Sequence, residues 1–169
     1  QELENLVGDA ASYGDYSCVL LATRTVRCWG FNHEGELGNG TTKNAATPTN
    51  VVGLSGVSAV SAGVTFACAR LTSGSVMCWG ADNYGQLGNG EDEADSAVPV
   101  DVIGLDRGVT AITVGSGHAC AITDTGHCEC QLVVPTPPAT PTPQCSSAEC
   151  GGRCFIRREC PFPRGCPIP

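Results

Sequence analysis

One feature constrains the fold of this chain more than any other: a Cys-Trp-Gly triplet followed by a glycine-rich loop is written twice. The first copy, CWGFNHEGELGNG, occupies residues 28–40, and the second, CWGADNYGQLGNG, occupies residues 78–90. Short stretches of alternating apolar residues and glycine turns surround both copies. Repeats of about 50 residues built in this way are typical of β-sheet units stacked side by side, most often propeller blades. We therefore expect an all-β chain.

The two copies extend into a longer alignment that matches Cys18 with Cys68 and Val26 with Val76. Its cores, CWGxNxxGxLGNG and AxxAGxxxxCAxxxxGxVxCWG, resemble the RCC1-like (regulator of chromosome condensation) repeat family from Val7 to about Leu132. Family members include nucleotide-exchange factors that also bind chromatin, and secreted propellers that bind other proteins. The resemblance implies antiparallel β blades, but we can map no exchange residues onto this sequence.

The alignment divides the chain into three regions. Residues 1–132 hold the repeats, which run over 7–56, 57–108 and a partial 109–132. The third repeat breaks off because Gln131 and Leu132 stand where Trp79 and Gly80 would be. Residues 133–143 form a Pro/Thr-rich extended linker, and residues 144–169 form a cysteine-rich, irregular tail that disulfides must hold together. We therefore expect propeller-like blades in an open, incomplete array, because closed propellers need four to eight blades.

Each repeat should contain four short strands. Apolar alternation predicts the first strand, and a tight turn, with Gly74 in the second repeat and Arg24 in the same place in the first, separates the next two. The prolines at 48 and 99 predict the start or the edge position of a final strand. For the second repeat the expected strands are 57–62, 68–71, 75–79 and 98–103, and for the first repeat the final strand is expected near 49–52.

The cysteine spacing predicts disulfides across the hairpins. Two cysteines ten residues apart around a tight turn face each other on antiparallel strands, close enough to bond. We predict the pairs Cys18–Cys28, Cys68–Cys78 and Cys120–Cys130. Six cysteines remain, and fifteen pairings among them are possible. The six are Cys128, Cys145, Cys150, Cys154, Cys160 and Cys166. We expect Cys128 to bond one of the five tail cysteines, which would fold the linker back over the broken blade.

Two clusters of potential metal ligands have simpler explanations. His118 would share one ribbon face with Cys120, Cys128 and Cys130, a set that zinc accepts. However, His118 aligns with aromatic packing positions, so packing and disulfides are preferred. The acidic run at 91–95 lacks the ligand spacing of a calcium loop and is interpreted as a solvated loop. We expect no metal and no cofactor.

Composition places the chain outside the cell. Twelve cysteines in 169 residues indicate an oxidising compartment, and the net charge of -8 argues against nucleic acid as a partner. No stretch is apolar enough to insert into a membrane. Asn39 begins a glycosylation sequon, and three threonines beside prolines suit O-linked glycans. These are Thr136, Thr140 and Thr142. The N-terminal glutamine suggests a processed mature chain.

No nucleophile, metalloprotease or phosphate-loop motif is present, so we predict no enzyme. The leading hypothesis is a secreted structural or interaction module that binds other copies of itself, or other extracellular proteins. Assembly through blade ends and tail would give an extracellular filament or surface appendage. One alternative is a serine protease inhibitor, with the tail presenting Arg157–Arg158 or Arg164 to a trypsin-like pocket. Another is that the chain is a fragment of a larger propeller-containing extracellular protein.

Overall fold

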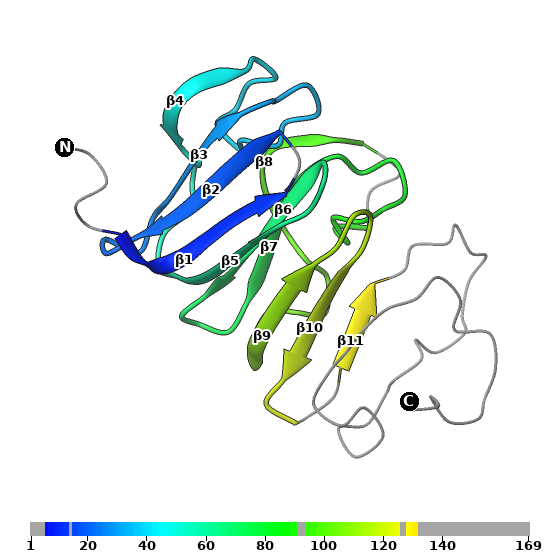
Figure 1. Ribbon diagram of the computed structural model, residues 1–169. Coiled ribbons are helices and arrows are strands. Elements are labelled where there is room, and N and C mark those ends of the chain that lie inside the picture. The colour runs from blue at the N-terminus through cyan, green and yellow to red at the C-terminus, as the bar shows by residue number, and fades with distance from the viewer. Residues whose placement is uncertain (1–5, 14, 91–93, 126–127, 132–169) are drawn as a thin grey trace, which may run out of the picture.

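The computed structural model describes residues 6–13, 15–90, 94–125 and 128–131 of the chain (Figure 1). These residues form strands and turns without a helix, and so they contain no helix that could cross a membrane. The strands are β1 (Leu6–Tyr13), β2 (Tyr16–Leu21), β3 (Val26–Gly30), β4 (Ala45–Asn50), β5 (Val57–Ala62), β6 (Phe66–Leu71), β7 (Val76–Gly80), β8 (Ser96–Asp101), β9 (Val109–Val114), β10 (Ala119–Thr123) and β11 (Cys128–Gln131).

The strands form three antiparallel sheets, one for each repeat. Sheet 1 has the order β1-β2-β3-β4, sheet 2 has the order β5-β6-β7-β8, and sheet 3 has three described strands in the order β11-β10-β9. Figure 1 shows the sheets one after another, with β5 lying between β1 and β9. The predicted all-β, open array of blades is confirmed. The predicted linker (133–143) and tail (144–169) lie outside the described residues.

The apolar core lies between successive sheets. One buried cluster combines side chains of sheets 1 and 2, among them Leu37, Val60 and Trp79, and a second combines sheets 2 and 3, among them Phe66, Leu87 and Val109. Short strands of this kind bury one face by stacking on the next sheet, as in other repeat proteins. Neither end of the array can bury its outer face in the same way among the described residues.

The hairpin turns follow the expected chemistry. Gly74 adopts a φ of 85°, and Arg24, in the equivalent place in the first repeat, adopts a φ of 59°. A side chain carbon on Gly74 would come within 2.7 Å of the Gly108 nitrogen, whereas Arg24 instead donates from its guanidinium to the Val57 carbonyl at 3.5 Å. Glycine adopts this left-handed backbone at little steric cost, whereas at Arg24 the side-chain contact with Val57 offsets part of the cost.

In the first two repeats, the last strand begins earlier than predicted. The final strands were expected to begin near residues 49 and 98. Instead, β4 begins at Ala45 and β8 at Ser96, so Pro48 and Pro99 lie inside their strands. Both strands are sheet edges, where a residue without an N–H group interrupts no ladder on the solvent side. The prolines therefore mark edge strands, and the part of the prediction that made them strand starts was wrong.

Candidate interaction site

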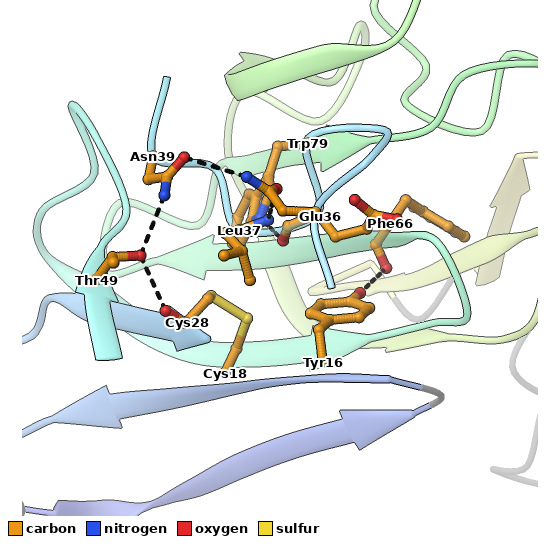
Figure 2. Close-up of a disulfide and its surroundings, with 10 residues drawn as sticks. Tyr16, Cys18, Cys28, Glu36, Leu37, Asn39, Thr49, Phe66 and Trp79 are labelled. Carbon is orange, nitrogen blue, oxygen red and sulfur yellow. Dashed lines mark hydrogen bonds between the residues drawn. A yellow bond between two sulfur atoms is a disulfide. The ribbon is translucent and has the colours of Figure 1, made fainter. Parts of the chain in front are cut away.

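The two hairpin disulfides of the first and second repeats are present. Cys18 pairs directly with Cys28, and Cys68 with Cys78, with a Cα–Cα distance of 4.1 Å in each case. Each bond joins the two central strands of a four-stranded sheet and is fully buried. The disulfides therefore brace the blades from inside, and Figure 2 shows the first of them beneath the loop described next.

The prediction of a third hairpin disulfide, at Cys120, was wrong. Cys120 is a free, buried thiol, although the backbone register pairs Cys120 with Cys130 as predicted. In sheets 1 and 2 the strand carrying the second cysteine is held between two neighbours, whereas β11 is paired only with β10 among the described strands. A strand held from one side fixes cross-strand side-chain geometry less tightly, and a disulfide tolerates little error in that geometry. The side chain of Cys128 and the five tail cysteines lie outside the described residues.

The glycine-rich loops after the Cys-Trp-Gly triplets share one internal architecture. In the first loop (residues 31–44), the Asn32 carboxamide accepts the Leu37 N–H at 2.8 Å and donates to the Thr41 and Lys43 carbonyls at 2.8 and 3.0 Å. In the second loop (residues 81–95), the Asp82 carboxylate accepts the Leu87 N–H at 2.9 Å. One buried polar side chain thus organises each loop and turns its leucine into the core.

The first loop binds the second sheet. The Trp79 indole Nε1–H donates to the Glu36 carbonyl at 2.9 Å, and the Gly40 N–H donates to the Ala97 carbonyl at 2.9 Å. Gly38 lies so close to the indole that a side chain carbon there would be 2.9 Å from its ring atoms. As Figure 2 shows, Trp79 reaches from sheet 2 to the backbone of the first loop. The glycines therefore let the loop backbone lie flat on the tryptophan.

A second polar contact between the sheets involves Tyr16. Its buried hydroxyl donates to the Phe66 carbonyl at 2.6 Å, from the start of β2 to the start of β6. Burial of the phenol raises the pKa of Tyr16 far above its usual value, and the nearby Glu36 carboxylate raises it further. Tyr16 therefore remains protonated and keeps donating this bond across the accessible pH range.

Glu36 is the most unusual side chain of the first loop, because it is a fully buried carboxylate. One oxygen accepts the Glu34 N–H at 2.9 Å, and the other, Oε1, has no hydrogen-bond partner among the described residues. Burial raises the pKa of Glu36; backbone N–H groups oppose the rise, and the Glu34 carboxylate adds to it. In the second loop the neutral Gln86 occupies the equivalent place and accepts the Tyr84 N–H at 2.9 Å.

The outer side of sheet 1 presents the same surface that the first loop covers on sheet 2. Trp79 and Ala81 are fully buried in sheet 2. Their counterparts in sheet 1 are open: Trp29 is only half-buried, and Phe31 is 39% exposed and stacked on His33 with ring centroids 4.5 Å apart. We call Trp29, Gly30, Phe31 and Ala46 the receiving surface. None of these four residues carries a titratable side chain.

The remaining predicted site residues take structural positions or fall outside the description. Asn39 uses its carboxamide inside the first loop: Nδ2, the atom that would carry a glycan, donates to Thr49 Oγ1 at 3.3 Å, and Oδ1 accepts the Thr41 hydroxyl at 2.8 Å. The threonines of the linker are not described. Asp95 accepts the Asp82 N–H at 2.8 Å, whereas the rest of the acidic run, 91–93, is not described.

In the described part of the chain, no three His, Cys, Asp or Glu side chains gather where they could hold a metal ion. Among the four candidate zinc ligands, His118 packs against Gly115, and the side chains of Cys128 and Cys130 are not described. Sequence reasoning also missed the contact between Trp79 and the loop of the preceding repeat. The signal was available, because each Cys-Trp-Gly triplet accompanies a Gly-x-Leu-Gly-Asn-Gly loop.

Comparisons with known proteins agree with this geometry. The family model described as the regulator of chromosome condensation (RCC1) repeat matches residues 26–70 and 73–122, more than half of the chain, and a second model of the same repeat matches residues 57–86. A search of curated protein sequences gives no significant match.

Three solved structures illustrate the similarity in fold. Human WBSCR16 matches with a TM-score of 0.67 and 22% identity, over 78% of this chain and 34% of that protein. Yeast RCC1 (Prp20) bound to Kap60 matches with a TM-score of 0.66 and 21% identity, over 75% and 30%. Prp20p of Saccharomyces cerevisiae, a protein described as binding Gsp1p and histones, matches with a TM-score of 0.65 and 21% identity, over 75% of this chain and 31% of that protein. The chain thus spans about a third of these structures' length.

Proposed function

This chain belongs to the regulator of chromosome condensation (RCC1) repeat family, and we propose that it is a secreted, non-enzymatic structural and interaction module. Its partners are other copies of itself or other extracellular proteins, bound through the ends of the blade array. Repeated end-to-end contacts of this kind produce a filament or surface appendage when they do not close into a ring.

The observation that carries the proposal is the exposed outer side of sheet 1. Sheet 2 is packed between two neighbours and buries Trp79 and Ala81 completely, whereas the matching positions of sheet 1 remain open. Repeat proteins are stable because each unit buries its faces against adjacent units, and uncovered terminal faces favour association. A surface with a tryptophan and a phenylalanine at its centre has the composition of an interface core.

Secretion is supported by the way the cysteines are used. Two buried disulfides join neighbouring strands within the blades, and bonds of this kind persist in oxidising compartments. The net charge of -8 favours a protein partner over nucleic acid, because phosphate binding depends on lysine and arginine. Gsp1p, histones and Kap60 are named for the yeast relative, and none is carried over to this chain.

Electron microscopy and light scattering of the native protein test the assembly. We expect extended particles far larger than 17.3 kDa, which grow with concentration. A dispersed monomer of that mass at high concentration would defeat the proposal, and mass spectrometry showing a longer native chain would favour a fragment instead.

A matched pair of variants tests the route of assembly. Phe31→Asp places a charge on the receiving surface, whereas Val64→Asp does so on the turn between β5 and β6, and the two side chains are equally exposed at 39%. We expect the first variant to lower the assembled mass and the second to leave it unchanged. Equal effects from both variants would remove the outer side of sheet 1 from the interface.

A further inference from the structure

We propose that Asn89 is a site of spontaneous deamidation, whereas Asn39, in the same local sequence, is protected by the fold. Both asparagines belong to a Leu-Gly-Asn-Gly sequence, at residues 37–40 and 87–90. Asparagine followed by glycine is especially prone to this reaction, because glycine has no side chain to hinder the attack of its own nitrogen. The reaction needs neither secretion nor assembly, so this proposal is independent of the proposed function.

Deamidation proceeds through a ring that the chain forms by itself. The backbone nitrogen of the glycine gives up its proton and attacks Cγ of the asparagine. The Cγ–Nδ2 bond then breaks, and the departing nitrogen takes up the proton and leaves as ammonia. Water opens the resulting succinimide at either carbonyl, which yields aspartate or isoaspartate. The glycine N–H must therefore be free of a hydrogen bond, and the asparagine carboxamide must be able to turn toward it.

The first loop meets neither requirement. The Gly40 N–H donates to the Ala97 carbonyl at 2.9 Å. The Asn39 carboxamide is held from both ends, because Nδ2 donates to Thr49 Oγ1 at 3.3 Å and Oδ1 accepts the Thr41 hydroxyl at 2.8 Å. Figure 2 shows the first of these two side-chain contacts. Three hydrogen bonds must therefore open before Asn39 can react.

The second loop lacks the groups that impose these restraints. The Gly90 N–H has no hydrogen-bond partner among the described residues, where sheet 3 has no strand beyond β11 to match the edge strand β8. In the strand register Val100, which has no hydroxyl group, takes the place of Thr49. In the sequence Glu91 takes the place of Thr41. The nitrogen that attacks is thus free at the second site and engaged at the first.

Exposure and backbone conformation do not separate the two sites. Both asparagines are half-buried, and both of the glycines that follow them are exposed. The φ angles of these glycines are also alike, 79° at Gly40 and 75° at Gly90. The hydrogen bonds therefore remain as the difference that decides which site reacts.

Deamidation at Asn89 changes both the charge and the backbone of the second loop. Either product adds a carboxylate to a chain whose net charge is -8, next to the acidic run at 91–95. Isoaspartate also lengthens the backbone directly after Gly88, whose carbonyl accepts the Ile103 N–H at 2.9 Å. The second loop should therefore change as the protein ages, while the first loop does not.

Peptide mapping compares the two sites within one folded, full-length chain. Protein made without glycans is incubated in heavy-oxygen water at mildly alkaline pH, then reduced and cut after lysine and arginine. Residues 28–43 and 71–107 then form separate peptides, one for each site. Mass spectrometry measures the heavy oxygen that succinimide hydrolysis leaves in each peptide. We expect Asn89 to react at least about tenfold faster than Asn39, because opening even one hydrogen bond slows a reaction severalfold.

Three controls assign this difference to the fold. In urea with the disulfides reduced, the two sites should react at similar rates, because their immediate neighbours are both glycines. Asn89→Gln should remove the label from peptide 71–107. Thr49→Val, which gives the first repeat the residue of the second, should speed the reaction at Asn39 and leave Asn89 unchanged.

Equal rates at Asn39 and Asn89 in the folded natural chain would overturn the proposal. An Asn89 that becomes labelled only in urea would also overturn it, since the Gly90 N–H would then be held in the folded protein. A difference of the same size in urea would assign the selectivity to the local sequence and contradict the argument from hydrogen bonds. None of these results bears on particle size, so the assembly proposal is tested separately.

Discussion

The exchange of Glu36 for glutamine should stabilise the protein, and the reverse exchange at Gln86 should destabilise it. Both side chains are buried in equivalent loops, and each accepts one backbone N–H at 2.9 Å. Glu36 carries in addition a buried oxygen with no described hydrogen-bond partner. An unsatisfied buried polar group costs about 1–3 kcal/mol, and more when it is charged. Glutamine keeps a polar atom at this place but removes the charge, and a buried charge costs more than a buried neutral group. We therefore expect Glu36→Gln to raise the free energy of unfolding at pH 7 by about 1–3 kcal/mol.

The pH dependence separates the charge from the shape of the side chain. Burial raises the pKa of Glu36 in the folded protein above its unfolded value, so folding favours the protonated carboxyl. The contribution of Glu36 to stability is then fully present below the unfolded pKa of about 4.3 and is lost as the pH rises through the folded pKa. The advantage of Glu36→Gln should accordingly disappear near pH 4.

Urea unfolding with the disulfides intact measures both effects, at pH 7 and at pH 4. Gln86→Glu serves as the reverse control and should lose stability at pH 7 but not at pH 4. A Glu36→Gln protein that is no more stable than the natural chain at pH 7, or whose advantage persists unchanged at pH 4, would contradict the argument from buried charge.

Three further variants or reagents test other parts of the structure. Replacing Cys18 and Cys28 together by alanine should lower the free energy of unfolding by about 2–3 kcal/mol, measured in urea, and no loss would mean that the bond does not constrain the unfolded chain. Gly38→Ala forces a side chain against Trp79 at a positive φ of 60°, so it should cost more than about 1 kcal/mol and shift tryptophan emission to longer wavelength; an unchanged spectrum would refute the close packing. The Cys120 thiol should resist alkylation until the protein is denatured, as peptide mass spectrometry can follow, and rapid labelling of the folded chain would contradict its burial.

Much of the fold was predictable because two aligned copies of the repeat show the same residue spacings. The ten-residue spacing of Cys18 and Cys28 fixed the hairpin register, and the same spacing in the second repeat confirmed it independently. The strand Val57–Ala62 was predicted with its observed bounds, because its alternation of apolar and polar residues reflects a half-buried sheet.

The failures occur where pairing with a distant segment decides the outcome. The β4 sequence AATPTN has neither alternation nor strong β propensity, so only its ladder with β3 makes it a strand. A glutamate in a glycine-rich loop is expected to be exposed, and Glu36 is buried because Trp79, 43 residues further along, covers its backbone. Cys120 shows the limit of register arguments, since correct pairing with Cys130 did not make a bond.

The loop-to-tryptophan contact also bears on how such arrays change in length. Each of the first two repeats encodes both halves of the contact, the tryptophan after its cysteine and the glycine loop that follows. A tandem duplication of one repeat would therefore create a complete new interface without any compensating substitution elsewhere. The third repeat has lost this property, because Gln131 replaces the tryptophan. Insertions by duplication should thus be tolerated ahead of residue 109, whereas a blade added after the third repeat would find no Gly-x-Leu-Gly-Asn-Gly loop for its own tryptophan to contact.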